Sequence, residues 1–440
     1  MNGSWHTETE ALIAVHVMET DKYKMTTGLA AWHMPLSKET VTQYAILPHV
    51  LLRGTRAHPG PERLMQAFDE LYGASISGGA AKQGDSQTIQ FTLQCASETH
   101  LPEAKGLFGD ALELFAQTLY DPFLPGGVFA EKAVSTEKTL HRQRIENAMN
   151  DKIAYAGDRC VQLMFAEDPF GIPRNGYVEA VGQVDSASLY NAYREMTGSQ
   201  TLHVYLVGPL PAKETARMIL DTFLHAAQAQ GLASAEDSAQ TAPLTHPFRS
   251  TRRSEPAELV VERLDVTQGK LNFGISTGVA YADDAYPALL VYNGILGGFP
   301  HSKLFVNVRE KASLAYYASS RLEGLKGAMF VQSGIEIDKM DRARDIILEQ
   351  LEAIASGNIT DDELDFTKDG LTNQYLLSDD QPMTGAMLQM YGRLSGRDRS
   401  VDELLRGILS VTRADVIDVA RGVKPEIVYF LRDREEVRHA

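Results

Sequence analysis

The sequence has too few cysteines for a disulfide framework. Cys95 and Cys160 are the only two in 440 residues, whereas small secreted folds that depend on disulfides use several closely spaced pairs. This scarcity fits a reducing compartment.

Long hydrophobic runs are also missing. No stretch approaches the ~18 uninterrupted apolar residues of a membrane-spanning helix. Residues 1–15 show no basic segment followed by an apolar one, which a secretory signal would have. We therefore expect a soluble, cytoplasmic protein with no membrane partner.

Basic residues are fewer than acidic residues. The 42 Lys and Arg face 58 Asp and Glu, which gives a formal net charge of -16 at pH 7. Binding to nucleic-acid phosphates needs clustered Lys and Arg, so we expect no nucleic-acid partner. An acidic surface would suit basic or unfolded peptides, but it is also common in proteins with no such role.

Two familiar classes of catalytic motif are absent. Gly297-Gly298 has neither the Gly-Lys-Ser/Thr of a phosphate loop nor the Gly-x-Gly-x-x-Gly of a dinucleotide site, and a tight turn next to a helix explains it. No Ser/His/Asp or Cys/His pattern indicates an independent peptidase.

The chain divides into two halves of similar size. Residues 227–256 are rich in Ala, Ser, Gln and Pro and have no hydrophobic period, as a connection would. We predict an N-terminal domain at 1–226, a linker at 227–256 and a C-terminal domain at 257–440.

Each half mixes strand and helix periodicity. Apolar and polar residues alternate at 11–20, 24–34 and 86–95, as in half-buried antiparallel strands. Helical spacing marks 38–53, 61–72, 101–119, 127–149, 284–297, 338–356, 361–377 and 401–421. The predicted fold class is α+β, in which each domain is a mostly antiparallel sheet with helices packed on one face.

The two halves end alike. In each, a valine precedes a candidate helix cap, Asp185 or Thr412, and a β-branched strand with an aromatic residue follows the helix, at 201–207 and at 426–431. We interpret this similarity as a duplication, so the two domains should be homologous.

Residues 45–55, Ala-Ile-Leu-Pro-His-Val-Leu-Leu-Arg-Gly-Thr, lie on the predicted helix 38–53. Together with Asp-Glu-Leu-Tyr-Gly-Ala-Ser at 69–75, this segment resembles the first functional helix of the M16 (pitrilysin, insulinase-like) peptidase family. Active members carry His-x-x-Glu-His there. Two histidines four residues apart lie on one helical face and can bind one Zn²⁺, and the Glu can act as general base toward the bound water.

The resemblance implies that this chain has lost the zinc site. The first His position is Ala45, the Glu position is Pro48, and only His49 remains. The third ligand of the family, a later Glu, falls on Arg144, where a cation would repel zinc. We expect no metal in this chain and a hydrogen-bonded, structural His49. Because proline has no N–H group, the helix should also kink or restart near 45–48.

A second segment keeps its signature. Residues 296–317 resemble the C-terminal-domain pattern of the same family, Arg-Glu-x-x-Gly-Leu-x-Tyr, with Ser313 in place of the Gly. The resemblance implies that Arg309 and Tyr316 reach the substrate beside the metal, where a cation and a phenol can stabilise an oxyanion. The alternative is that Arg309 ends a helix and Tyr316 packs in a strand.

Small residues fill 73–84, Gly-Ala-Ser-Ile-Ser-Gly-Gly-Ala-Ala-Lys-Gln-Gly. In the M16 family an edge strand at this place takes up substrate peptide by β-addition. A glycine-rich bulge is the alternative.

The resemblance covers essentially the whole chain and is closest to an inactive bacterial subgroup without the zinc motif. It implies a non-catalytic, substrate-binding subunit of a heterodimeric zinc metallopeptidase that acts on peptides. A partner with the His-x-x-Glu-His motif would supply the zinc, and this chain would have no peptidase activity alone. The alternative is a structural or peptide-binding scaffold without a protease partner. The subgroup is also linked by name to elongation factor P modification, which no residue supports.

Overall fold

The computed structural model describes residues 4–101, 103–232, 245–247 and 257–434. By contacts, these residues form two compact units. Unit 1 comprises 1–146, 173–244 and 381–390, and unit 2 comprises 147–172, 245–380 and 391–440. The predicted linker 227–256 lies mostly outside the described residues, so the boundaries that we predict along the chain stay a prediction.

Unit 1 is built on a six-stranded sheet with the order β1-β2-β6-β3-β5-β4, in which only the β2–β6 pair is parallel. Its strands are β1 (Trp5–Glu10), β2 (Ile13–Glu19), β3 (Met25–Pro35), β4 (Ser75–Gln83), β5 (Ser86–Ala96) and β6 (Leu202–Gly208). Its helices are α1 (Val41–Leu51), α2 (Pro61–Asp69), α3 (Leu107–Tyr120), α4 (Glu131–Ala148), α6 (Val178–Val181), α7 (Ser186–Ser199) and α8 (Ala212–Ala229).

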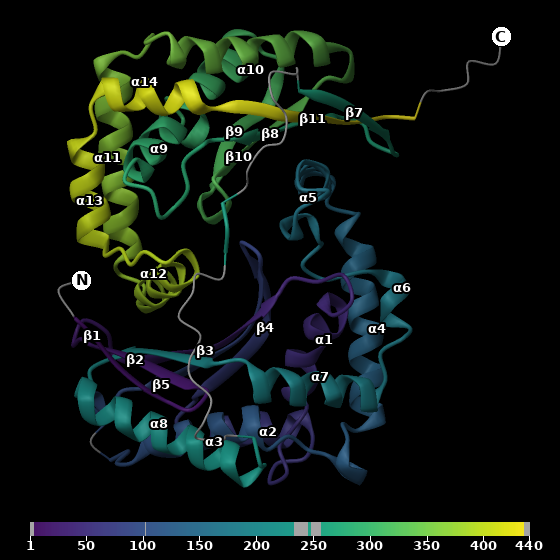
Figure 1. Ribbon diagram of the computed structural model, residues 1–440, viewed down its shortest axis with the longest axis vertical. Coiled ribbons are helices and arrows are strands. Elements are labelled where there is room, and N and C mark those ends of the chain that lie inside the picture. The colour runs from purple at the N-terminus through teal and green to yellow at the C-terminus, as the bar shows by residue number, and fades with distance from the viewer. Residues whose placement is uncertain (1–3, 102, 233–244, 248–256, 435–440) are drawn as a thin grey trace. The chain divides into compact units, whose positions relative to one another are not determined.

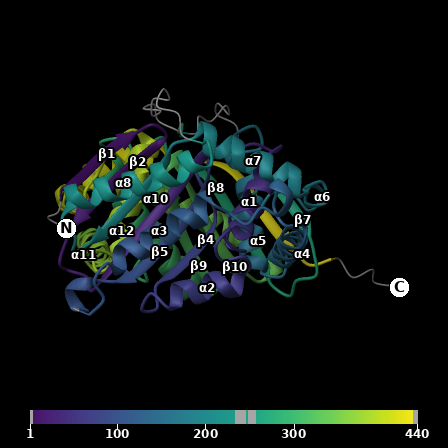
Figure 2. The ribbon, with the colours of Figure 1, turned by 90° about the horizontal axis from the view of Figure 1, so that it is seen from below.

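Helices α3 and α8 cover one face of this sheet (Figures 1 and 2). The strands alternate, so one set of side chains points at these helices and forms the core. Trp32 on β3 meets Tyr120 of α3 edge to face at 5.9 Å, and Phe115 of α3 meets Phe223 of α8 at 5.8 Å. Aromatic burial on this scale is a main source of stability for the unit.

Unit 2 is built on a five-stranded sheet with the order β7-β11-β8-β10-β9, in which only the β7–β11 pair is parallel. Its strands are β7 (Glu258–Arg263), β8 (Gly269–Ser276), β9 (Ala315–Glu323), β10 (Ala328–Ile335) and β11 (Lys424–Arg432). Its helices are α5 (Lys152–Met164), α9 (Tyr286–Asn293), α10 (Met340–Ala355), α11 (Asp361–Ser378), α13 (Val401–Ser410) and α14 (Arg413–Gly422). Helix α12 (Pro382–Ser395) has residues in both units.

The two sheets share one topology. Reading β2, β3, β4, β5 and β6 of unit 1 as the equivalents of β7, β8, β9, β10 and β11 of unit 2 gives the same strand order and the same single parallel pair. The helices before the closing strands also begin alike, since Asp185 and Thr412 each form a reciprocal capping box. The α+β fold with two duplicated domains is therefore confirmed.

Helix α5 is the main feature that the sequence pattern missed. It belongs to the first half of the chain but lies in unit 2, where Cys160 and Phe165 pack against Tyr429 and Leu431 of β11. Figure 1 shows α5 on the opposite side of the unit 2 sheet from α10 and α14. The sheet of unit 2 is therefore covered on both faces.

Local details differ from the predicted ranges. The predicted helix 401–421 is two helices, because Thr412 interrupts it and caps α14. The predicted helix 284–297 continues beyond Asn293 as a π-helical turn, Gly294–Gly298. No helix in the part of the chain that the structure describes is long and apolar enough to cross a membrane.

Candidate functional site: a replaced zinc centre and an exposed Arg/Tyr segment

Helix α1 carries the first set of predicted site residues. Ala45 is only 2% exposed, Pro48 is buried, and His49 is partly exposed. The sequence predicts a kink or a restart near 45–48; the helix runs through Pro48 as one element, so it does not restart there. A proline inside a helix costs about 3 kcal/mol, but nine of the eleven residues of α1 are buried, and this packing holds the helix together.

Arg53, just after α1, and Arg144 of α4 form an ion-pair cluster around Glu137, which begins the sequence stretch 137–144 that ends at Arg144. Glu137 of α4 is 3% exposed. It accepts a hydrogen bond from Arg53 Nε at 2.8 Å and another from Arg144 Nη2 at 3.3 Å. Arg144, which the family resemblance aligns with the third zinc ligand, therefore holds Glu137. Its spacing of seven residues from Glu137 on one helix face is the signal that could have revealed the pair.

Two histidines next to this cluster are held neutral. Burial, and after it the positive charge of Arg144, lowers the pKa of His49 to about 4. Burial also lowers the pKa of His141, although its Nε2 atom lies 2.8 Å from the carbonyl oxygen of Asn175. At neutral pH the local charge therefore comes from two guanidinium groups and one carboxylate.

These residues do not fit zinc. Ala45 and Pro48 have no donor atom, Arg144 is a cation, and the carboxylate of Glu137 is engaged by two guanidinium groups. Within the described ranges, no group of three or more His, Cys, Asp or Glu is placed to hold a metal ion. The site also has no free carboxylate at the Glu position of the motif to act as a base toward water.

We expect the stability of unit 1 to fall with acid because of His49. The unfolded pKa of about 6.5 exceeds the folded value of about 4, so between these pH values the unfolded chain binds a proton that the folded chain does not. The contribution of neutral His49 to the free energy of unfolding is complete above pH 6.5 and is lost as the pH falls to 4. Because the ring is partly hydrated, we expect a loss of about 1–2 kcal/mol. Urea unfolding at pH 7 and pH 5 measures it.

His49→Gln is the matched control for this pH effect. It keeps a polar side chain but has no proton to bind, so its unfolding free energy should fall less between pH 7 and pH 5 than that of the wild type. Equal losses in both proteins would show that His49 does not carry the effect.

The second predicted pair lies in unit 2 on either side of a tight turn. Arg309 is exposed in the π-helical segment Phe305–Lys311, and its guanidinium carbon lies 4.6 Å from the centre of the Phe305 ring. Tyr316 is 67% exposed at the start of β9. Arg309 thus lies in the last turn of a helical segment and Tyr316 on a strand, and both side chains are exposed.

The backbone conformation at Ser313 explains why the family pattern has a glycine at this position. Its φ angle is 52°, a left-handed conformation that glycine adopts without steric cost. The turn is held by two backbone bonds, from Ala312 N to Asn307 O at 3.3 Å and from Leu314 N to Val308 O at 3.1 Å. The serine therefore adopts the strained left-handed backbone conformation that this turn requires.

Replacing Ser313 with Gly should therefore stabilise unit 2. Relief of the left-handed strain is worth about 1 kcal/mol, partly offset by the greater freedom of glycine in the unfolded chain. We expect a rise of about 1–3 °C in the melting temperature, measured by calorimetry. Ser313→Ala, which keeps the Cβ atom, should give no such rise. A lower melting temperature for the Gly variant would contradict the strain argument.

Strand β4 settles one of the alternatives for 73–84. It pairs with β5 in an unbroken register from Ser75 to Gln83 and lies at the edge of its sheet. The bulge alternative is therefore wrong. By topology β4 corresponds to β9, so Tyr316 lies on the equivalent edge strand of unit 2.

The comparisons with known proteins agree with this architecture. The family model described as the peptidase M16 inactive domain matches residues 183–371. The chain is 35% identical to the probable inactive metalloprotease YmfF of Bacillus subtilis, over 96% of each protein. A conserved protein from Enterococcus faecalis, solved by crystallography, aligns with a TM-score of 0.87 at 28% identity and covers 99% of this chain and 100% of that one.

A more distant solved structure shows the same fold. The peptidase M16 inactive domain from Pseudomonas fluorescens aligns with a TM-score of 0.77 at 16% identity, over 99% of both chains.

Proposed function

The chain belongs to the M16 peptidase family, in its subgroup without the zinc motif, and from this premise we propose that it is the substrate-binding subunit of a heterodimeric zinc metallopeptidase. A second M16 subunit, with an intact His-x-x-Glu-His motif, supplies the zinc. This chain supplies Arg309 and Tyr316 and acts on peptides only in that complex.

The proposal rests on the contrast between the residues at the zinc positions and the segment that contains Arg309 and Tyr316. The zinc positions are filled by Ala45, Pro48 and Arg144, and the last of these is tied to Glu137. Arg309 and Tyr316, in contrast, keep the family residues and expose their polar groups. A phenol that is 67% exposed on an edge strand does nothing for the core of its own unit, so contact with a substrate explains it better.

The oxyanion chemistry needs no metal ion in this chain. A partner's zinc would activate the attacking water, and negative charge would develop on the peptide carbonyl oxygen. A guanidinium and a phenol can each donate a hydrogen bond to that oxygen. Arg309 and Tyr316 would therefore stabilise the transition state next to the zinc of the partner.

We place this complex in the cytoplasm. Both cysteines are free and buried, and burial raises the pKa of each thiol to about 12. Such thiols need no disulfide partner and react slowly with oxidants.

Co-purification from the native host tests the proposal. A tagged chain should recover an M16 protein with the His-x-x-Glu-His motif, and the pair should cleave an unstructured peptide that neither subunit cleaves alone. Recovery of a partner without peptidase activity, or of peptides without a zinc subunit, would favour the scaffold function instead.

A further inference from the structure

An apolar pocket lies beside the replaced zinc centre, within unit 1. Its volume is about 330 Å³. Three prolines and two aromatic rings make up much of its wall: Pro59, Pro61, Pro122, Phe123 and Phe129. A pocket of this size can accept one large side chain of a ligand.

The proline wall of the pocket is fixed by backbone contacts. Gly54 forms a bridge with Pro59, Thr55 forms one with Pro122, and Phe123 N donates to Gly54 O at 3.0 Å. Gly54 has a φ angle of 135°, and a Cβ atom there would lie 2.5 Å from Gly60 N. Only glycine allows these loops to approach so closely, so the wall is formed before any ligand arrives.

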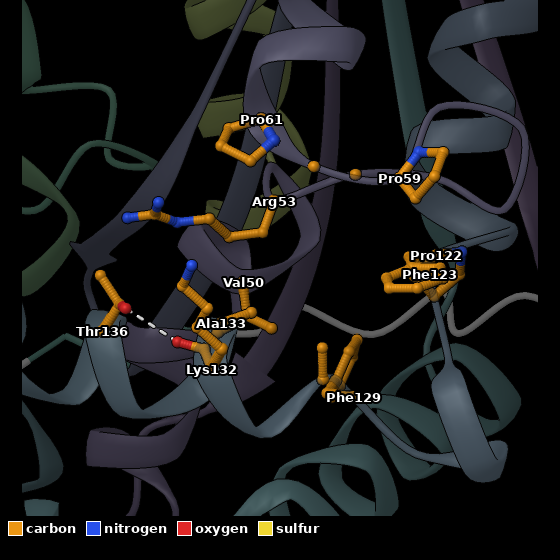
Figure 3. Close-up of a pocket in the computed structure, with 13 residues that line it drawn as sticks. Val50, Arg53, Pro59, Pro61, Pro122, Phe123, Phe129, Lys132, Ala133 and Thr136 are labelled. Carbon is orange, nitrogen blue, oxygen red and sulfur yellow. Dashed lines mark hydrogen bonds between the residues drawn. The ribbon is translucent and has the colours of Figure 1, made fainter.

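Positive charge borders the pocket at one end. Figure 3 shows Arg53 and Lys132 on one side of the pocket and Pro122 and Phe123 on the other. Arg53 is partly neutralised by Glu137. Lys132 is exposed in the first turn of α4 and forms no ion pair with any residue of the described ranges. The exposed ammonium group of Lys132 therefore lies next to an apolar pocket, in a chain whose net charge is -16.

We propose that this pocket binds the C-terminal residue of a peptide that ends in an aromatic side chain. A terminal residue presents its side chain and its carboxylate from one Cα atom. The ring would fill the space between the prolines and Phe129, and the carboxylate would meet Lys132 and Arg53. An ammonium–carboxylate hydrogen bond is about twice as strong as a neutral one, so the terminal charge sets the specificity.

This site does not depend on the function that we propose for Arg309 and Tyr316, which lie in the other unit. It needs no zinc partner and no turnover, so a binding measurement on the full chain alone can test it. Its failure would leave the peptidase proposal untouched.

Titration calorimetry with Ala-Ala-Ala-Phe, with the same peptide amidated at its C-terminus, and with N-acetylphenylalanine is the test. We expect the free-acid peptide to bind with a Kd on the order of 1 mM. The amide should bind at least about tenfold more weakly, and added salt should weaken only the acid.

Two variants locate the site, and a third is the matched control. Lys132→Met keeps the length of the side chain and removes its charge, so it should weaken binding of the acid about tenfold and leave the amide unchanged. Ala133→Leu fills the pocket and should abolish binding of both peptides. Lys105→Met removes an exposed lysine that does not line the pocket and should bind like wild type. Melting temperatures check that all three are folded.

Three results would overturn the proposal. Equal binding of acid and amide would remove the role of the carboxylate. Wild-type binding by Ala133→Leu would place the ligand elsewhere. Binding of N-acetylphenylalanine without binding of the tetrapeptide would mean that the pocket takes small aromatic acids and not peptides.

Discussion

Arg309→Ala should lower kcat of the reconstituted two-subunit peptidase by roughly a hundred- to a thousandfold. The loss of one oxyanion donor typically costs roughly 2.7–4 kcal/mol in the transition state. The fold should not suffer, because Arg309 is exposed and stacks over the Phe305 ring of its own segment. Steady-state kinetics with the zinc subunit at saturation measure the effect.

Tyr316→Phe is the finer test of the same idea. It removes one hydroxyl from a side chain that is 67% exposed, so kcat should fall in the same direction while KM and assembly stay close to wild type. Arg421→Ala is the matched control, since it removes an exposed arginine at the end of α14. Complex formation is measured on the same samples by size-exclusion chromatography. If both site variants assemble and cleave like wild type, Arg309 and Tyr316 are structural and the scaffold function takes over.

The triple variant Ala45→His, Pro48→Glu, Arg144→Glu should bind one zinc ion with a Kd of about 1 μM or tighter, which corresponds to about 8 kcal/mol. Two histidines at 45 and 49 would share a face of α1. Position 144 faces them, because Arg144 is close enough to lower the pKa of His49. The wild-type chain should retain no stoichiometric zinc after dialysis. A competition assay with a chromophoric chelator and elemental mass spectrometry give both quantities.

The double variant Ala45→His, Pro48→Glu separates ligand geometry from charge. It has two histidines but keeps the cation of Arg144, so its zinc affinity should be at least about a hundredfold weaker than that of the triple variant. Glu137 remains paired with Arg53 in the triple variant, so the loss of Arg144 does not leave this buried carboxylate without a cation. Equal affinities for the double and triple variants would show that Arg144 does not keep zinc out.

Much of the fold could be predicted because it is encoded in short stretches. The strands predicted at 24–34 and 86–95 correspond to β3 and β5, although β3 is buried from Thr26 to Met34 and is not half-buried as predicted. The caps at Asp185 and Thr412 form the two predicted helix starts. A helix cap accepts hydrogen bonds from backbone amides within three residues of it. The alternation of apolar and polar residues along a strand requires only that one face of the strand be buried. Helix 401–421 was predicted as one piece because apolar spacing continues across Thr412, whereas the chain turns there.

The identity of the site residues was determined by the sequence alone. No conformation gives Ala45 or Pro48 a metal donor or makes Arg144 an anion, so the mismatch with zinc follows from covalent structure. The retained Arg309 and Tyr316 were visible in the same way. The exposure of Tyr316 could not be predicted in this way, because it depends on β9 lying at the edge of its sheet.

Only the tertiary structure decided how the lost site is filled. Glu137 is neutralised by Arg53, 84 residues away along the chain, and the packing of α1 keeps Pro48 inside one helix. Helix α5 joins unit 2 although its sequence neighbours belong to unit 1, because Cys160 and Phe165 find their apolar partners on β11. Local patterns determine which residues are present and which faces are apolar, whereas burial and ion pairing between distant segments depend on what the folded chain brings into contact.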